Sequence, residues 1–172
     1  MILITYQSKA VLNILENKKT YLAKPSISFK REYAALIDML NLKCACPVFA
    51  VVKGRKQNTS GRVSGTVKFT LNVPDEYIKY TEFGTWADFM YACKFSKPYD
   101  YTKIATAFEE VNTRKYSHLI EELKNHKSQE HYKFPQAILE KIEPNWVVKY
   151  EVLPDNIKAI NLVEKFANKF RK

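Results

Sequence analysis

The chain has 172 residues, 46% of them hydrophobic and 27% charged, and its 28 basic and 18 acidic residues give a formal net charge of +10. This length makes one domain or two small ones, and the composition excludes a disordered chain. No run approaches the roughly 18 apolar residues of a membrane span. The positive charge favours polyanionic partners, because neutralising phosphates releases their counterions.

The first fifty residues predict short strands and helices in alternation. Residues 2–6 are an apolar, β-rich run, and Ser8 can cap a helix with an apolar inner face. Ser28 can cap a second helix, whose apolar side chains recur at helical spacing: Phe29, Tyr33, Leu36, Ile37 and Leu40. Residues 48–52 are a continuous apolar run, which is typical of a buried strand.

Residues 48–73 carry the clearest local signal. Three of the four glycines, Gly54, Gly61 and Gly65, fall within twelve residues after the apolar run 48–52. The segment 63–73 alternates apolar and polar residues like a half-buried strand. We therefore expect a β-hairpin with a long basic loop. Between Asp38 and Asp75 there are six basic residues and no acidic one, a local charge of +6. The side chains expected to contact phosphates are Lys53, Arg55, Lys56, Arg62 and Lys68; an ordinary solvated loop is the alternative.

The second half of the chain predicts more helix than strand. Thr85 can cap a helix that reaches Cys93, and further helices are expected over 102–112, 113–127, 134–142 and 155–170. Residues 146–153 predict a strand. Because the order lacks regular β-α-β units, the predicted class is α+β. We expect a single domain over 1–172, with a mixed or antiparallel sheet, surrounding helices and an optional helical insertion at 102–142.

Aromatic and cysteine residues leave their roles open. Tyr80 and Trp86 belong to a stretch over 77–101 in which aromatic residues and lysines interleave. Such rings either stack on nucleobases or form core, and both interpretations stay open. The three cysteines form no disulfide framework and the N-terminus does not look like a signal peptide, so we expect a cytoplasmic protein. Neither the cysteines nor the histidines have metal-ligand spacing, so no metal site is expected.

Three short motifs carry a family resemblance over residues 1–95. They are Ile-Thr-Tyr-Gln at 4–7, Pro-Val-Phe-Ala at 47–50, and Val-Pro-Asp at 73–75 followed by Trp86. In this order they resemble the bacterial and phage proteins known as domain of unknown function 3841. The resemblance implies an origin in phage or another mobile element, and it implies no settled activity.

The order of elements also resembles the split β-sheet of the ADP-ribosyltransferase superfamily. This resemblance implies NAD as cofactor, with Gln7 or Thr5 at the ribose and Tyr21 stacked on the nicotinamide. It places Glu143, or else Glu151, where a carboxylate stabilises the positive charge that develops on the ribose carbon. The first strand lacks the superfamily's usual His or Arg, and no Ser-Thr-Ser stretch follows a strand. A chain with these departures can keep a binding cleft without catalysis.

Three functions follow as hypotheses. The leading one is a small basic protein that needs no cofactor and binds a phosphate-rich partner, either nucleic acid or a nucleotide-derived ligand, as a counter-defence factor. The second is an ADP-ribosyltransferase-like enzyme that uses NAD. The third is a protein inhibitor that docks on a nucleic-acid-processing complex through its aromatic segment. No membrane partner is expected, and the oligomeric state is not predicted.

Overall fold

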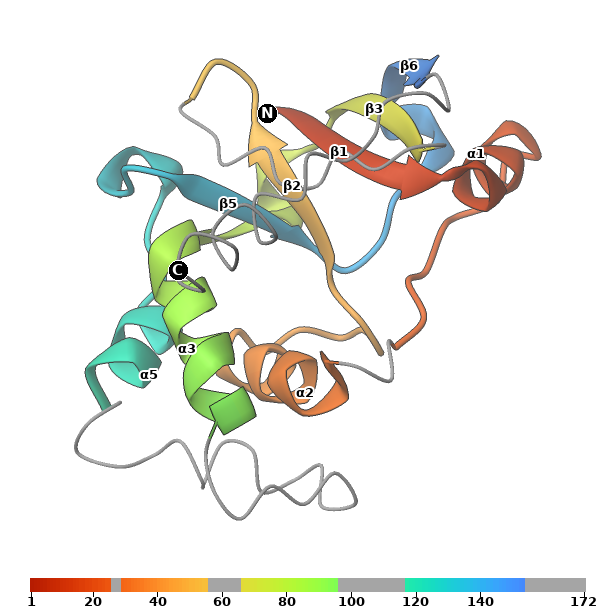
Figure 1. Cartoon of the computed structure of the whole chain (residues 1–172). Helices are drawn as coiled ribbons and strands as arrows, with labels where there is room; N and C mark the ends of the chain where they lie inside the picture. Colours follow the sequence, from red (N-terminus) through yellow and green to blue (C-terminus); the bar gives the residue numbers. More distant parts are fainter. Residues whose placement is uncertain (26–28, 56–65, 96–116, 154–172) are drawn as a thin grey trace, which may run out of the picture.

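Six strands form one antiparallel sheet in the computed structural model, which describes residues 1–25, 29–55, 66–95 and 117–153. The strands are β1 (Ile2–Ser8), β2 (Val48–Val52), β3 (Thr66–Asn72), β4 (Lys79–Glu82), β5 (Pro135–Leu139) and β6 (Val147–Val152). Their order across the sheet is β4-β5-β2-β1-β3-β6 (Figure 1). The predicted α+β class and the antiparallel sheet are confirmed.

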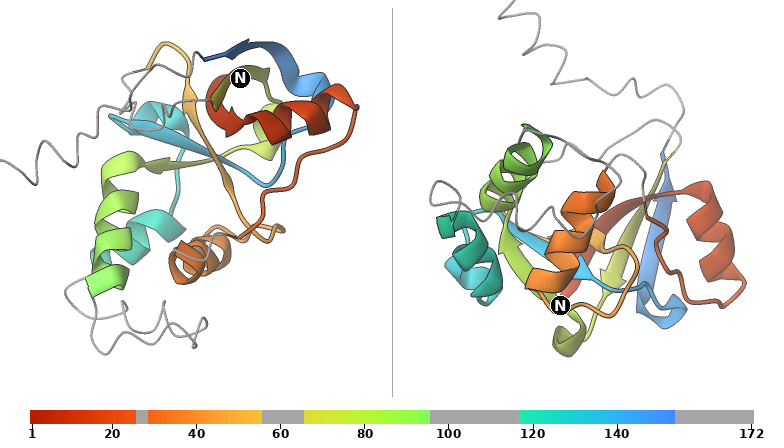
Figure 2. Two further views of the ribbon diagram at one scale, coloured as in Figure 1. Left: turned by 45° about the vertical axis from the view of Figure 1, so that its right-hand side comes forward. Right: turned by 90° about the horizontal axis from the view of Figure 1, so that it is seen from below.

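Four α-helices lie around the sheet in two groups. They are α1 (Lys9–Glu16), α2 (Lys30–Met39), α3 (Phe83–Phe95) and α5 (Ser117–Lys124). Helices α2, α3 and α5 lie together beside the β2-β5 half, whereas α1 lies apart from them, next to β1 and β3 (Figures 1 and 2). Short 3-10 turns occur at Asp75–Tyr77, Gln129–His131 and Pro144–Trp146.

Alternation along the central strands produces two hydrophobic cores. Phe49 of β2 is paired in register with Ile138 of β5, and both pack with the α2-α3-α5 group. Their strand neighbours point to the opposite face of the sheet. There Val48, Ala50 and Leu139 join a larger core with β1, β3 and the inner face of α1. The β2-β5 region is therefore covered on both faces, which explains its continuous apolar sequence.

The predicted hairpin over 48–73 is wrong, although both of its strands exist. β1 lies between β2 and β3, and Leu3 pairs with Val52 on one side and with Leu71 on the other. β2 and β3 both run antiparallel to β1, so they are parallel to each other. A tight turn cannot join two parallel strands. β2 and β3 are thus not hairpin partners, and most of the basic segment between them, residues 56–65, lies outside the described residues.

Two local predictions also need correction. The expected helix over 134–142 is instead the strand β5, paired between β2 and β4. That part of the range 102–142 is an integral strand of the sheet and not part of a helical insertion. The helix assigned to a Thr85 cap begins earlier, at Phe83, and the Thr85 hydroxyl donates to the Glu122 carboxylate at 2.8 Å.

Several predictions fall outside the described residues. They include the helices over 102–112 and 155–170, the Ser28 cap, and the basic residues Lys56 and Arg62. The helices over 9–16 and 30–39 and the strand over 147–152 agree with expectation. Within the part of the chain that the structure describes, none of the helices has the length and apolar character needed to span a bilayer.

Candidate functional site

The sheet opens between β1 and β2, and this split builds the candidate site. β1 pairs with β3 along its whole length, from Ile2–Asn72 to Ser8–Thr66. It pairs with β2 only at Leu3–Val52 and Ile4–Val51. Beyond Ile4 the strand therefore stays on β3 and leaves β2.

A threonine hydroxyl replaces the backbone bond that is missing at the split. Continuing the register would place Tyr6 opposite Phe49, but the ladder ends before this pair. Instead the Thr5 hydroxyl donates to the carbonyl oxygen of Phe49 at 2.8 Å, and the Gln7 side-chain amide donates to the Thr5 oxygen at 2.8 Å. Thr5 is only 1% exposed. This chain of bonds satisfies the β2 carbonyl and orients Gln7.

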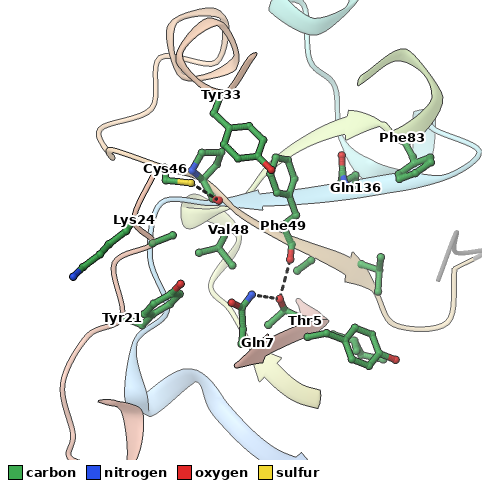
Figure 3. A pocket seen from close by; sticks show the side chains of 16 residues that line it. Thr5, Gln7, Tyr21, Lys24, Tyr33, Cys46, Val48, Phe49, Phe83 and Gln136 are labelled. Atoms are coloured by element: carbon green, nitrogen blue, oxygen red, sulfur yellow. Dashed lines mark hydrogen bonds between the residues drawn. The ribbon is translucent and has the colours of Figure 1, made fainter. Parts of the chain in front are cut away.

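A pocket of about 390 Å³, the split pocket, lies in this opening (Figure 3). It is lined from β1, β2, the segment after α1, the turn before β2, and single residues of α2, α3 and β5. The lining residues are Ile4, Thr5, Tyr6, Gln7, Tyr21, Ala23, Lys24, Tyr33, Cys46, Pro47, Val48, Phe49, Ala50, Val51, Phe83 and Gln136. Lys24 is the one charged residue among these sixteen.

Aromatic rings make one wall of the split pocket rigid. The ring centroids of Tyr33 and Phe49 are 5.5 Å apart. Trp86 stacks behind both, with centroid distances of 6.3 Å to Tyr33 and 6.0 Å to Phe49, and Phe89 continues the stack. Because Trp86 is 3% exposed, it supports the wall from the core.

The opposite wall is Tyr21, which is fixed by its backbone. Tyr21 forms an isolated antiparallel bridge with Ile142, with N–H···O distances of 2.9 and 3.0 Å. Burial, and secondarily the neighbouring Cys46, raise the pKa of the Tyr21 hydroxyl, and the same two causes lead for Tyr33. Both hydroxyls are therefore protonated at neutral pH and can donate hydrogen bonds into the pocket, toward which they point in Figure 3.

The residues assigned by the transferase resemblance divide into two groups. Thr5, Gln7 and Tyr21 all line the split pocket. Glu143 does not: one of its carboxylate oxygens accepts from Thr20 at 2.5 Å and the other pairs with Lys141 at 2.6 Å. These contacts lower the pKa of Glu143, and the Lys141 bond has the largest effect. Glu151 lies on β6, exposed and 3.9 Å from Lys68. Neither carboxylate is part of the pocket.

The described basic residues of the predicted phosphate site are not gathered together. Lys53 follows β2 at the end away from the pocket, where its N–H bonds to Ile2. The Arg55 guanidinium donates to the carbonyl of Tyr132 at 2.6 Å. Lys68 lies opposite Tyr6 in the sheet and beside Glu151. Lys53 and Lys68 are thus four positions apart along β1, about 13 Å at the rise of a strand.

The two aromatic residues predicted as a contact surface are buried. Tyr80 is 9% exposed and Trp86 is 3% exposed. Burial raises the pKa of Tyr80 to about 12, with smaller contributions from Asp75 and Glu130. For these two residues the core interpretation holds, and neither presents a surface to a partner.

Sequence reasoning missed the residues that complete the pocket. Tyr33 fits the apolar stripe of a helix, and Phe49 fits a buried strand, so the sequence pattern predicts a core position for each. Gln136 lay in a segment expected to be helical. The one available signal was the motif around Phe49, since it follows Pro47 and precedes the basic segment. Among the described residues, His, Cys, Asp and Glu form no group of three or more that could hold a metal ion.

Comparison of the chain with protein-family models, with curated proteins and with solved structures found no match in any of the three. The two family resemblances read from the sequence therefore stay predictions.

Proposed function

We propose that the chain binds a nucleotide-derived ligand in the split pocket, with NAD and its fragments as the first candidates. One observation carries the proposal. Gln7 or Thr5 and Tyr21, which the transferase resemblance assigns to the ribose and the nicotinamide, line one pocket at an opening of the sheet. They come from a strand and from the segment after the next helix.

The chemistry of the lining supports a flat, polar-edged ligand. A volume of about 390 Å³ lies within the range of small-molecule sites, which combine apolar walls with a few placed polar groups. Phe49 and Tyr33 provide a stacking surface. The hydroxyls of Tyr21 and Tyr33 and the amide of Gln7, which lies between Thr5 and Tyr21 in Figure 3, can bond to ring substituents or a ribose.

The lining has no acidic side chain, which admits an anionic ligand and indicates binding rather than turnover. Among its sixteen described residues, Lys24 is basic and none is acidic. A phosphate therefore meets no like charge there. Cleavage of a glycosidic bond by the expected mechanism needs a carboxylate near the ribose, whereas Glu143 is engaged by Lys141 and Thr20. We therefore propose that the chain binds this ligand without cleaving it.

Calorimetric titration of the full chain with NAD, ADP-ribose and AMP tests this proposal. We expect saturable binding that weakens about tenfold or more in Gln7→Ala and Tyr21→Ala, since each loses a contact in the pocket. Asn13→Ala and Tyr77→Ala, which change exposed residues outside the pocket, are the matched controls. Absence of binding at millimolar ligand, or equal affinity in all four variants, would overturn it.

The same preparation separates two other functions. Release of nicotinamide from NAD would add catalysis, and Glu143→Gln would then show whether that carboxylate takes part.

A nucleic-acid partner has less support, because Arg55 and Lys68 contact protein groups. Charge reversal of Lys53 and Lys68 should leave nucleotide binding unchanged. If it abolishes RNA or DNA binding instead, the basic segment is the functional surface.

A further inference from the structure

The edge strand β6 presents a row of exposed apolar side chains. It is the last strand of the sheet, and among the described strands only β3 lies beside it (Figure 1). Val148 is 60% exposed, Tyr150 46% and Val152 47%. Lys149 and Glu151 between them are also exposed. An exposed edge strand with this composition is a template for pairing with another chain.

The backbone of β6 has hydrogen-bonding groups directed outward. The N–H of Leu153 donates to the Thr66 carbonyl at 3.0 Å, so position 153 faces β3. In an antiparallel ladder alternate residues face alternate sides. Residues 149 and 151 therefore also bond toward β3, and the N–H and C=O groups of Tyr150 and Val152 point away from it. No described strand takes these groups.

The sequence of β6 is complementary to itself. Consider a second copy of the strand, antiparallel and related by a two-fold axis at Tyr150. Lys149 then lies opposite Glu151 of the copy, and Val148 lies opposite Val152. Each relation occurs twice across the axis, and Tyr150 meets its own equivalent. Directly opposite residues of an antiparallel pair contact each other, and opposite charges and apolar pairs both stabilise it.

We propose that β6 pairs with β6 of a second copy of this chain, antiparallel about Tyr150, so that the two sheets become continuous. The outward groups of Tyr150 would bond to the same groups of its equivalent, and those of Val152 to the partner strand near Val148. Such a two-fold interface uses one surface patch on both copies.

Charge identifies the occupant as a second copy rather than an unrelated peptide. Glu151 already has Lys68 on its β3 side, 3.9 Å away. In the proposed pair it gains Lys149 of the copy on the other side, so one carboxylate lies between two ammonium groups. The paired segment is itself neutral, with one Lys and one Glu per copy. It therefore adds no like charges to a chain whose net charge of +10 opposes association.

Sedimentation velocity of the full chain over a range of concentrations tests the proposal. We expect a monomer of 20.1 kDa in equilibrium with a dimer. Lys149→Glu and Glu151→Lys each place like charges opposite one another at two positions, so each should weaken dimerisation about tenfold. The double variant Lys149→Glu/Glu151→Lys restores both opposite-charge pairs and should recover the dimer. Lys127→Glu makes the same change in net charge as Lys149→Glu, on an exposed residue away from β6, and is the control for that variant.

Hydrogen exchange locates the interface independently. Protection of the amides of Tyr150 and Val152 should rise with protein concentration, because they face outward in the monomer and are bonded in the dimer. Three results would each overturn the proposal. The chain could stay monomeric, the two single charge variants could leave the dimer affinity unchanged, or the protection of these amides could be independent of concentration. None of these outcomes bears on ligand binding in the split pocket.

Discussion

β1 has two neighbours, and it pairs with them very differently. With β3 it forms seven consecutive register pairs, from Ile2–Asn72 to Ser8–Thr66. With β2 it forms two, Leu3–Val52 and Ile4–Val51, and then diverges. The β3 side is closed and carries fully buried residues such as Phe69 and Leu71. The β2 side opens into the split pocket.

This difference shows how one strand can serve both stability and binding. On the closed side, the ladder is continuous, and Leu3, Phe69 and Leu71 build core. On the open side, the Thr5 hydroxyl donates to the Phe49 carbonyl of β2, and the Gln7 amide in turn donates to the Thr5 oxygen. A polar side chain is stable at this buried place because the ladder has stopped and left a carbonyl that needs a donor.

The largest expected effect contrasts two phenylalanines. Phe69 on the closed side is 0% exposed, so Phe69→Ala should lower the free energy of unfolding by about 3–5 kcal/mol. Phe49 lines the pocket and is only partly buried, so Phe49→Ala should cost at least about 1 kcal/mol less. Chemical denaturation of both variants measures this. Equal losses would mean that the open side is packed as tightly as the closed side.

A smaller effect is expected from Thr5, whose hydroxyl bridges the split. Thr5→Val keeps the shape but leaves the Phe49 carbonyl without its donor, which should cost about 1–3 kcal/mol. It should also weaken ligand binding, since Gln7 loses the group that orients it. Thr81→Val is the matched control: Thr81 is equally buried, and its hydroxyl has no partner among the described residues. A Thr81→Val loss as large as that of Thr5→Val would contradict the bridging role.

The smallest effect concerns the pH dependence of the Tyr21 wall. The bond from Lys141 and the bond from Thr20 hold the pKa of Glu143 below its ordinary value of 4.5. The contribution of this carboxylate to stability is therefore present above pH 4.5 and is lost as the pH falls through the lowered pKa. At pH 7 the free energy of unfolding of the wild type should exceed that of Glu143→Gln by less than about 1 kcal/mol. Denaturation at pH 7 and pH 3 should show that gap closing in acid; a constant gap would exclude the titration of Glu143 as its origin.

Local sequence pattern predicted the strands well and their neighbours poorly. The apolar run 48–52 identifies β2, because a strand buried on both faces is apolar throughout. The alternation up to residue 73 identifies β3, because a strand buried on one face alternates apolar and polar residues. Which strand lies beside which depends on contacts between distant residues. The intervening β1 therefore turned an expected hairpin into a parallel pair of next-nearest strands. The helix predicted over 134–142 is wrong for a related reason. Ala137, Ile138 and Leu139 are buried on both faces of the sheet, and a short apolar run fits a helix and a strand equally well.

The candidate site was predictable only in part. Gln7 and Tyr21 were found through a family resemblance, and both line the split pocket. Glu143 was assigned from the same resemblance, yet it contacts Lys141 and Thr20 outside the pocket. Tyr33 and Phe49 look like core residues in sequence. Their exposure to the pocket comes from the separation of β1 and β2, which no local sequence pattern predicts.

The strand order has a consequence for how the chain folds. Each of the five described pairings joins segments far apart in sequence, and the nearest two, β1 and β2, are separated by about forty residues. Such non-local pairing is slow, because loop-closure entropy must be lost before contacts compensate for it. During synthesis, β2 and β3 gain their outer neighbours only when residues 135–152 emerge. At about 5–20 residues per second, β1, β2 and β3 therefore wait several seconds for both outer neighbours.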